Sequence, residues 1–148
     1  MGITDEADTP VESIIGQVLE FRLGDEWYCV DVGNVTEIVD VREVTPMPNS
    51  PDHIEGVLDL RGRTTTIVDP KKLLELDVDS DDPRVMVFDP TVFEEEQSIG
   101  WLVDYISEVA RVDEEDVEQS SMDEPFIRRI LQRNGRFVIW LDPSAFHD

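Results

Sequence analysis

Short apolar segments with turn residues between them dominate the chain and constrain its fold most strongly. Each segment spans four to seven residues, and in most of them apolar and polar side chains alternate. Alternation with a period of two indicates half-buried β-strands, and segments of this length are short for helices. Ten or so short strands are typical of barrels and sandwiches, and this number suits two small barrels better than one. The sequence therefore predicts an all-β fold built from Val18–Leu23, Trp27–Val32, Val35–Val41, Ile54–Leu60, Arg63–Val68, Val85–Phe88, Ile99–Val103, Ile106–Val112, Phe126–Leu131 and Phe137–Leu141.

Two of these strands end in the same signal, which suggests a duplication. Ile67–Pro70 leads into Lys71–Leu76, and Trp140–Pro143 leads into Ser144–His147. In each case aspartate and then proline follow an apolar strand, which is the order expected for a helix N-cap and the first helical position. We expect a short helix after each strand. The same dipeptide occurs at Asp89-Pro90, where we expect only a turn.

The charge balance excludes some classes of partner. The chain carries 35 acidic and 12 basic residues, a formal net charge of -23, which disfavours direct binding to nucleic acid or to an anionic membrane. Two interpretations remain. The acidic residues could adapt the protein to a salt-saturated cytoplasm, or they could form an acidic decoy that binds a basic nucleic-acid-binding protein. The acidic residues fall on loops between many strands rather than in one stripe, which favours adaptation to salt.

The termini and the single cysteine bound the domain organisation. Residues 1–15 lack periodicity, so we expect a flexible N-terminal arm followed by one domain at residues 16–148. The chain shows neither a secretory signal pattern nor an apolar run long enough to span a bilayer, and we expect a cytoplasmic protein. Cys29 cannot form an internal disulfide. It lies in an alternating apolar run, where we expect a packed strand residue rather than a reactive thiol.

No arrangement of residues points to catalysis or to a cofactor. His53 and His147 lie far apart in the sequence, and neither has a nucleophile or metal ligands at a recognisable spacing. The acidic run at 77–82 lacks the glycine and the glutamate that a calcium loop needs at its sixth and twelfth positions. We therefore expect a protein that is not an enzyme and that holds no metal ion or cofactor.

Three segments together resemble the signature of the CheW family of chemotaxis coupling proteins. They are Val35–Ile38, Ile54–Gly62 and Ile67–Pro70. Their order and spacing are similar to the V-x-E-I, I-x-G-V-x-N-L-R-G and P-I-V-D motifs of that family, and the resemblance runs from about Val18 to Phe146. It implies two five-stranded SH3-like β-barrels that share a hydrophobic core, with short helices after the barrel strands. It also implies an adaptor that couples chemoreceptors to the histidine kinase CheA in membrane-associated receptor arrays.

The resemblance also places a receptor-binding groove on particular residues. In the family, the residues that match Glu37 and Arg61 form an ion pair at the edge of this groove, and we expect a bidentate pair here. Regular alternation would put Val35 and Glu37 on one face of their strand and Thr36 on the other. Two unrelated surface charges are the alternative to a pair. The residues assigned to the groove by resemblance are Val35, Glu37, Ile38, Val57, Leu58, Arg61 and Gly62, and the sequence leaves open whether Val57 or Leu58 belongs to the core.

A second surface is implied for the kinase, with the regulatory domain of CheA as the expected partner. The residues assigned to it by resemblance are Arg42, Val44, Thr45, Glu55 and Gly56. Gly56 lies inside a strand, which usually marks a bulge or a close backbone approach, and Gly62 suits a turn with positive φ. The chain departs from the family at Asp59, where many members have asparagine, and at 128–130, where a glycine is common.

Overall fold

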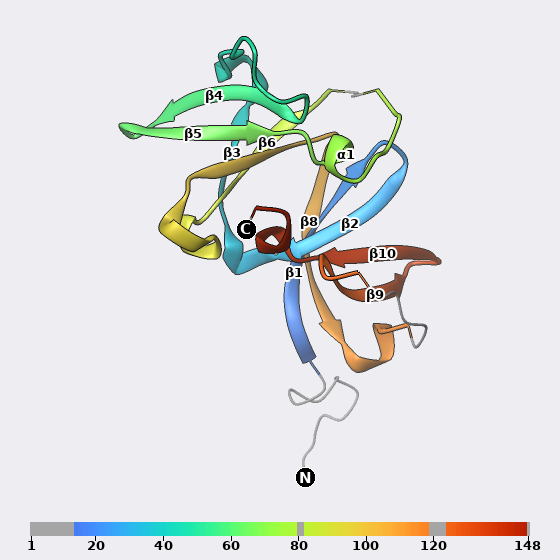
Figure 1. Cartoon of the computed structure of the whole chain (residues 1–148). Coiled ribbons are helices and arrows are strands. Elements are labelled where there is room, and N and C mark those ends of the chain that lie inside the picture. Colours follow the sequence, from blue (N-terminus) through green and yellow to red (C-terminus); the bar gives the residue numbers. More distant parts are fainter. Residues whose placement is uncertain (1–13, 80–81, 119–123, 148) are drawn as a thin grey trace.

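The computed structural model describes residues 14–79, 82–118 and 124–147, and within these ranges it contains ten strands in two five-stranded sheets. Figure 1 shows the two sheets as separate lobes. We call the sheet with the order β8-β1-β2-β10-β9 the terminal barrel, and the sheet with the order β3-β6-β7-β5-β4 the central barrel. This confirms the predicted all-β fold. The terminal barrel contains β1 (Ile14–Leu23), β2 (Glu26–Asp31), β8 (Tyr105–Asp113), β9 (Ile127–Arg133) and β10 (Arg136–Leu141); the central barrel contains β3 (Val35–Asp40), β4 (Ile54–Leu60), β5 (Arg63–Val68), β6 (Arg84–Phe88) and β7 (Ile99–Val103).

The helices of the described residues are single turns. The predicted caps are present, because the side chain of Asp69 accepts a hydrogen bond from the Lys71 amide and that of Asp142 accepts one from the Ser144 amide. Asp89 also caps a 3-10 turn, where only a chain reversal was expected. The α-helix is α1 (Pro70–Leu73), and the 3-10 turns are η2 (Val32–Asn34), η3 (Val41–Glu43), η4 (Pro90–Val92), η5 (Glu94–Glu96), η6 (Glu114–Asp116) and η7 (Pro143–Phe146).

The start of the domain differs from its predicted position. Strand β1 begins at Ile14, two residues before the expected boundary at residue 16, and it pairs with β8 from Ile14 onward. Residues 1–13, which make up most of the expected arm, lie outside the described residues.

The two halves of the chain repeat one another with an offset of 73 residues. The offset relates β4 to β9, β5 to β10 and η3 to η6 residue by residue. It also relates individual hydrogen bonds. The Asp69 amide donates to the His53 carbonyl and the Asp142 amide to the Phe126 carbonyl, both at 2.8 Å. The duplication expected from the two Asp-Pro signals therefore extends from η3 to Asp69 in the first half and from η6 to Asp142 in the second.

The repeated halves exchange strands. The β1–β2 hairpin comes from the first half but pairs with β8 and β10 of the second, and β6–β7 of the second half pairs with β3 and β5 of the first. In each barrel the exchange creates one parallel contact, between β10 and β2 and between β5 and β7. Each barrel therefore contains strands from both halves of the chain.

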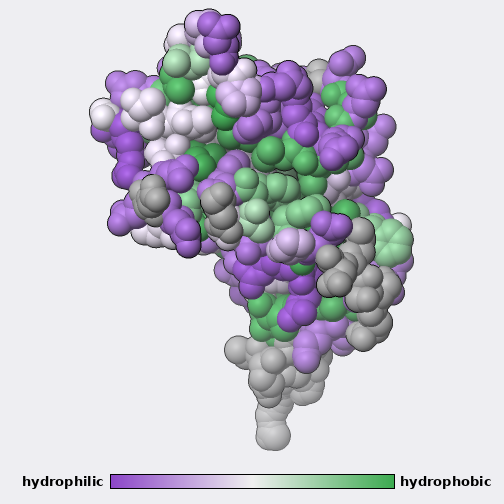
Figure 2. Space-filling model, viewed as in Figure 1, coloured by the Kyte–Doolittle hydropathy of each residue, from purple (hydrophilic) through white to green (hydrophobic). Residues whose placement is uncertain are grey.

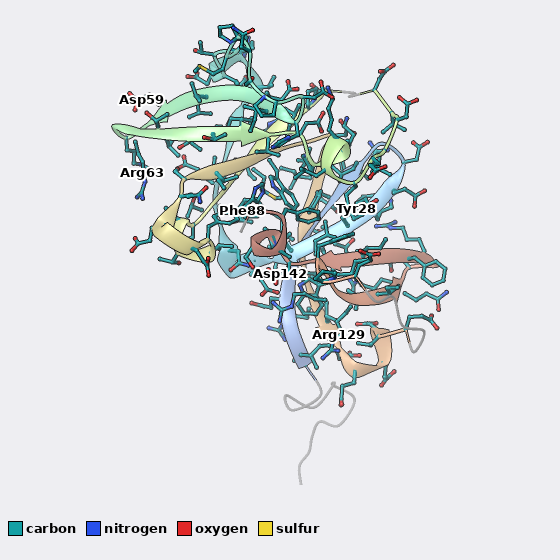
Figure 3. All side chains as sticks on the ribbon, viewed as in Figure 1. Tyr28, Asp59, Arg63, Phe88, Arg129 and Asp142 are labelled. Carbon is teal, nitrogen blue, oxygen red and sulfur yellow. The ribbon has the colours of Figure 1, made fainter. Side chains whose placement is uncertain are left out.

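The largest apolar cluster lies between the barrels. Figure 3 shows two of its members, Tyr28 of the terminal barrel and Phe88 of the central barrel, at the level where the lobes meet. Each barrel also encloses a smaller cluster of its own. The predicted shared core is thus present, and its buried members are Leu19, Phe21, Leu23, Tyr28, Val30, Val68, Met86, Phe88, Phe93, Ile99, Trp101, Val103 and Leu141.

A buried ion pair also links the barrels. Lys71 of α1 donates from Nζ to both carboxylate oxygens of Asp104 at 3.1 Å, and each side chain is only 2% exposed. The same carboxylate accepts a hydrogen bond from the amide of Gly24, in the β1–β2 turn. Because α1 follows the central barrel and Gly24 belongs to the terminal barrel, Asp104 connects both. No local pattern around Lys71 predicted that its side chain would be buried.

Cys29 is a packed strand residue, as predicted. It is fully buried in the core of the terminal barrel beside Val18 and Val138. Burial raises the pKa of the Cys29 thiol far above its usual value, and the nearby carboxylates of Glu20 and Asp31 raise it further. The thiolate, which is the reactive form, is therefore strongly disfavoured.

Candidate functional site

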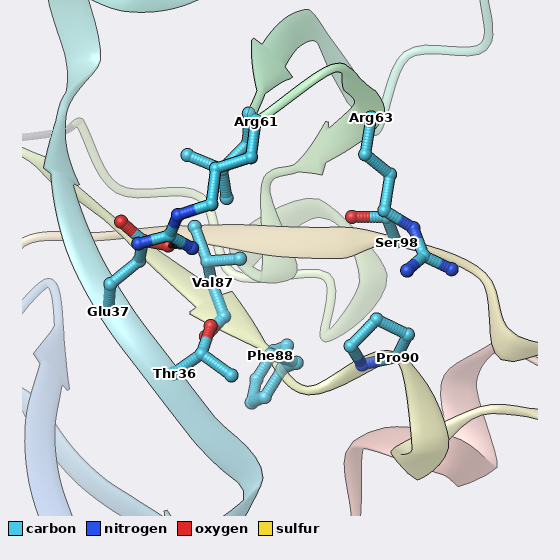
Figure 4. Close-up of a pocket in the computed structure, with 9 residues that line it drawn as sticks. Thr36, Glu37, Arg61, Arg63, Val87, Phe88, Pro90 and Ser98 are labelled. Atoms are coloured by element: carbon cyan, nitrogen blue, oxygen red, sulfur yellow. Dashed lines mark hydrogen bonds and ion pairs between the residues drawn. The ribbon is translucent and has the colours of Figure 1, made fainter.

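A cleft of about 250 Å³ opens on the central barrel, between β3 and the β4–β5 turn. Figure 4 shows Glu37 and Arg61 facing each other on one side of the cleft, and Arg63 and Ser98 on the other. Four segments that are distant in sequence contribute to it. The lining residues are Thr36, Glu37, Leu60, Arg61, Arg63, Val87, Phe88, Pro90 and Ser98.

Glu37 and Arg61 form the predicted ion pair. Arg61 Nη1 donates to Glu37 Oε2 at 2.7 Å, which is one hydrogen bond rather than the two of a bidentate pair. The Arg61 side chain is 76% exposed and that of Glu37 is 23% exposed. A pair this exposed contributes only about 0–1 kcal/mol to stability. The arginine is therefore held in place but remains accessible to a partner.

The backbone of the β4–β5 turn explains how Arg61 reaches the cleft. Arg61 and Gly62 are its two central residues, and both have positive φ, at 54° and 78°. Turns of this kind match the twist of a two-stranded ribbon and favour glycine, which confirms the expected role of Gly62. The equivalent turn between β9 and β10 uses Asn134 and Gly135 with nearly the same φ values, 53° and 77°. The turn is therefore a feature of the repeated unit, whereas the arginine is particular to the central barrel.

A bulge in β3 changes which side chains face the cleft. The ladder with β6 shifts register between Val35 and Glu37, so Thr36 is an extra residue in the strand. Its hydroxyl donates to the carbonyl oxygen of Val87 at 3.2 Å. Thr36 and Glu37 consequently both line the cleft. The expectation that Thr36 faces away from Glu37 is wrong, because strict alternation holds only in a regular ladder.

The residues assigned to the receptor groove separate into three groups. Glu37 and Arg61 line the cleft, and Gly62 shapes its turn. Leu58 is buried in the core of the central barrel, so of the two adjacent residues Val57 and Leu58 it is Leu58 that belongs to the core. The remaining three are half-buried: Val35 and Ile38, which pack against the shared core, and Val57.

The residues assigned to the kinase surface lie on two segments that pair with each other, one running from η3 to Thr45 and the other at the start of β4, where Gly56 itself is buried. Thr45 exchanges two backbone hydrogen bonds with Val57, at 2.7 and 2.9 Å, which attaches the segment after η3 to strand β4. The β4–β5 ladder shifts register at Glu55, and the following Gly56 has a φ of 156°. A Cβ at Gly56 would collide with the Thr45 carbonyl. The predicted bulge and close approach are therefore both present.

Arg42 and Val44 differ in their availability to a partner. Arg42 is exposed and binds Asp40 through three side-chain hydrogen bonds of 2.7 to 3.2 Å. These bonds and the one from the Arg42 amide lower the pKa of Asp40 to about 2. Val44 is half-buried and packs against the core of the central barrel. A charge placed at Val44 would therefore disturb the barrel as well as any surface contact.

Several cleft residues could not be found from the sequence. Arg63 donates from Nη2 to the carbonyl oxygen of Glu96 at 2.9 Å, and the hydroxyls of Thr65 and Ser98 are 2.7 Å apart. These contacts bring the segment before β7 against β5. A pairing between residues more than thirty positions apart leaves no local pattern in the sequence.

The described residues contain neither a metal-binding cluster nor a helix that could span a membrane. Within residues 14–79, 82–118 and 124–147, no group of three or more histidine, cysteine, aspartate or glutamate side chains is arranged to hold a metal ion. Over the same residues, no helix has the length and apolar character needed to cross a membrane.

Comparisons with known proteins agree with this arrangement. Residues 17–148 match the CheW-like domain family. The chain is 27% identical to a chemotaxis protein CheW of Thermotoga maritima over 129 residues, which cover 85% of this chain and 83% of the relative. It is 30% identical to a CheW of Rhizobium meliloti over 127 residues, which cover 82% and 81%. The crystal structure of the scaffolding protein TtCheW from Thermoanaerobacter tengcongensis aligns with a TM-score of 0.77 and 25% identity, covering 90% of this chain and 92% of that one.

Proposed function

The chain belongs to the CheW-like domain family and has the role of a chemotaxis adaptor, and we propose that it couples chemoreceptors to the regulatory domain of the histidine kinase CheA. The observation that carries this proposal is the exposed Glu37–Arg61 pair at the edge of the cleft. In this proposal the cleft side of the central barrel holds a receptor tip, and the groove residues are Val35, Glu37, Ile38, Val57, Arg61 and Gly62. Leu58 supports them from the core.

The kinase surface is proposed on the same barrel, on Arg42, Val44, Thr45, Glu55 and Gly56. The bulge at Glu55 and the Thr45–Val57 hydrogen bonds support this assignment, because they present the patch on a rigid part of the barrel. Function then requires both surfaces to be occupied together. Such a scaffold acts by bringing its partners together rather than by chemistry of its own, and the protein would be cytoplasmic and recruited to receptor arrays.

Two charge reversals test whether the surfaces are separate. Arg61→Glu should lower receptor binding at least tenfold and leave kinase binding within twofold, because it places two carboxylates together at the cleft edge. Arg42→Glu should do the opposite. Both arginines sit in exposed ion pairs, so each substitution serves as the control for the other and neither should unfold the barrel. Binding is measured with a purified receptor signalling fragment and the kinase regulatory domain at molar salt. Parallel loss of both partners in either variant would contradict the proposal.

The charge-swapped variant Glu37→Arg with Arg61→Glu tests the pair itself. It should recover part of the receptor binding lost by Arg61→Glu, because the swap restores an attractive pair. A coupling energy isolates the pair from the other contacts of each residue. Additive losses would show that the two residues act independently.

Thr45→Arg is a better probe of the kinase surface than Val44→Asp, because Thr45 is exposed and Val44 packs on the core.

We also propose that the acidic composition adapts the protein to molar salt, as in a halophilic archaeon. The acidic side chains behind the net charge of -23 repel one another in the compact state. At about 1 M salt the Debye length falls to about 3 Å, so the ions screen that repulsion. The melting temperature should rise as potassium chloride increases from dilute buffer to the molar range. Equal melting temperatures would contradict this adaptation. The acidic decoy has no support from the family to which the chain belongs.

A further inference from the structure

A second groove, of about 380 Å³, lies on a different part of the molecule, between α1 and the β9–β10 hairpin. We call it the α1–β10 groove. One wall belongs to the helix that follows the central barrel, and the other belongs to the terminal barrel. Figure 2 shows hydrophobic residues gathered in a band across the middle of this face, where the two barrels meet.

The walls of the α1–β10 groove are large apolar side chains that remain half-exposed. They pack against the shared core with one side and leave the other open. The apolar surface continues beyond the groove, because Phe137 shares a strand face with Ile139 and is 57% exposed. A contiguous apolar surface of this kind is typical of an interaction site. The half-buried wall residues are Leu73, Leu74, Leu76, Phe126, Ile127 and Ile139.

The charges at the groove define the chemistry of its occupant. Glu75 and Glu124 line it and are exposed, and none of its lining residues is basic. A segment with lysine or arginine beside an apolar stripe would match both the walls and the two carboxylates. Residues 1–13 of this chain would not, because they carry acidic residues and no lysine or arginine.

The edge of the terminal barrel favours a helix over an added strand as the occupant. Strand β9 lies at this edge, but part of its outer side is already paired. The Glu118 amide donates to the Ile130 carbonyl at 2.7 Å, and Val117 forms a bridge with Leu131. An added strand would compete with these bonds, whereas an amphipathic helix needs only side-chain contacts.

We propose that the α1–β10 groove binds an amphipathic helix of a partner protein, with an apolar stripe flanked by lysine or arginine. None of the residues assigned to the receptor groove or to the kinase surface lines it. This partner could therefore bind while receptor and kinase are both in place. Because its walls come from both barrels, the helix would also hold α1 against the terminal barrel.

A designed peptide tests the proposal. The probe is a synthetic helix of about 18 residues with leucines at i, i+3, i+4 and i+7 positions and lysines beside them, and the control is the same peptide with glutamate in place of lysine. Binding to the full-length, isotope-labelled chain is followed by NMR at 1 M sodium chloride, where non-specific attraction to an acidic protein is screened. The lysine peptide should shift amide signals of α1, β9 and β10, and the glutamate peptide should bind at least tenfold more weakly.

Three variants localise the binding. Phe137→Ala removes an exposed side chain and should weaken the lysine peptide at least tenfold without unfolding the protein. The double variant Glu75→Lys with Glu124→Lys should weaken the lysine peptide about tenfold and strengthen the glutamate peptide. Asp59→Lys is the matched control, because Asp59 is an exposed acid on β4, far from the groove in Figure 3, and it should change neither affinity.

Other outcomes would overturn the proposal. Three results would show that only net charge attracts the probe. They are signal shifts spread over the acidic surface, equal binding of the two peptides, and a Glu75→Lys with Glu124→Lys variant that behaves like Asp59→Lys. Absence of binding at millimolar peptide would exclude a helix site. Self-association of the chain that Phe137→Ala abolishes, measured by sedimentation, would show that a second copy covers the groove instead.

Discussion

The buried pair between Lys71 and Asp104 should be the most sensitive electrostatic contact in the protein. Lys71→Met keeps the length of the side chain but leaves the Asp104 carboxylate buried without the ammonium that lies 3.1 Å from both of its oxygens. Removing one partner of a buried pair typically costs about 3–5 kcal/mol. For a chain of this length, each kcal/mol corresponds to about 2–4 °C in melting temperature, so we expect a fall of about 6–20 °C.

The neighbouring lysine provides a matched control. Lys72 lies on the same helical turn, pairs with Asp52 at 3.4 Å, and both side chains are exposed. Lys72→Met should therefore change stability by no more than about 1 kcal/mol. The free energy of unfolding is measured by denaturant titration at molar salt, where surface pairs are screened and the buried pair is not.

The double variant Lys71→Met with Asp104→Asn completes the test. Asparagine can still accept the hydrogen bond from the Gly24 amide, which Asp104 accepts in the native protein. With both charges removed, most of the loss should be recovered, because a buried pair replaced by neutral residues is often nearly neutral in stability. Two results would refute this reasoning: a Lys71→Met effect as small as that of Lys72→Met, or a double variant as unstable as the sum of the single ones.

Three other predictions follow from single residues. Cys29 should react with a thiol reagent only when the protein unfolds, because burial raises its pKa; rapid labelling of the native protein would contradict this. Gly56→Ala should destabilise the protein by more than about 1 kcal/mol, because Gly56 has a φ of 156° and the Thr45 carbonyl occupies the space that a Cβ would need. Gly33→Ala is the control and should not destabilise the protein, because a Cβ there would meet nothing within 4 Å. Equal unfolding midpoints for the two variants would argue against the close approach at Gly56. Arg42→Ala should raise the pKa of Asp40 from about 2 toward its ordinary value, and NMR shifts of the carboxyl group measure this change. The native pair stabilises the folded state at pH values above the ordinary pKa of aspartate. This stabilisation is lost as the pH falls through about 2.

The elements of this fold could be predicted where the signal is local. Short apolar segments, most of them alternating, located all ten strands of the described residues, and the Asp-Pro pairs located the caps at Asp69 and Asp142. Glycine inside a strand indicated the close approach at Gly56, because only glycine leaves that space. In each of these cases the residue type itself carries the signal, even at Gly56, where the backbone that approaches belongs to Thr45 on another segment.

Features that depend on distant segments could not be predicted in the same way. The bulge at Thr36 arises from its pairing with β6, some fifty residues away. Lys71 and Lys72 are identical neighbours in sequence, but Lys71 is buried against the distant Asp104, whereas Lys72 is exposed beside Asp52. The floor of the cleft, including Phe88, comes from strands whose partners the alternation does not specify.

The exchange of hairpins between the halves sets an order in which the barrels can close during synthesis. All strands of the central barrel lie between Val35 and Val103, so this barrel can assemble before the rest of the chain leaves the ribosome. The β1–β2 hairpin is synthesised before β10, yet β2 pairs with β10, where Trp27 and Val138 are register partners. The hairpin therefore cannot complete its sheet until β10 has been synthesised. Until then its apolar face is uncovered, and exposed surface of this kind makes incomplete chains prone to aggregation. A nascent chain that stalls before Arg136 would therefore need chaperone protection, although its central barrel could already be folded.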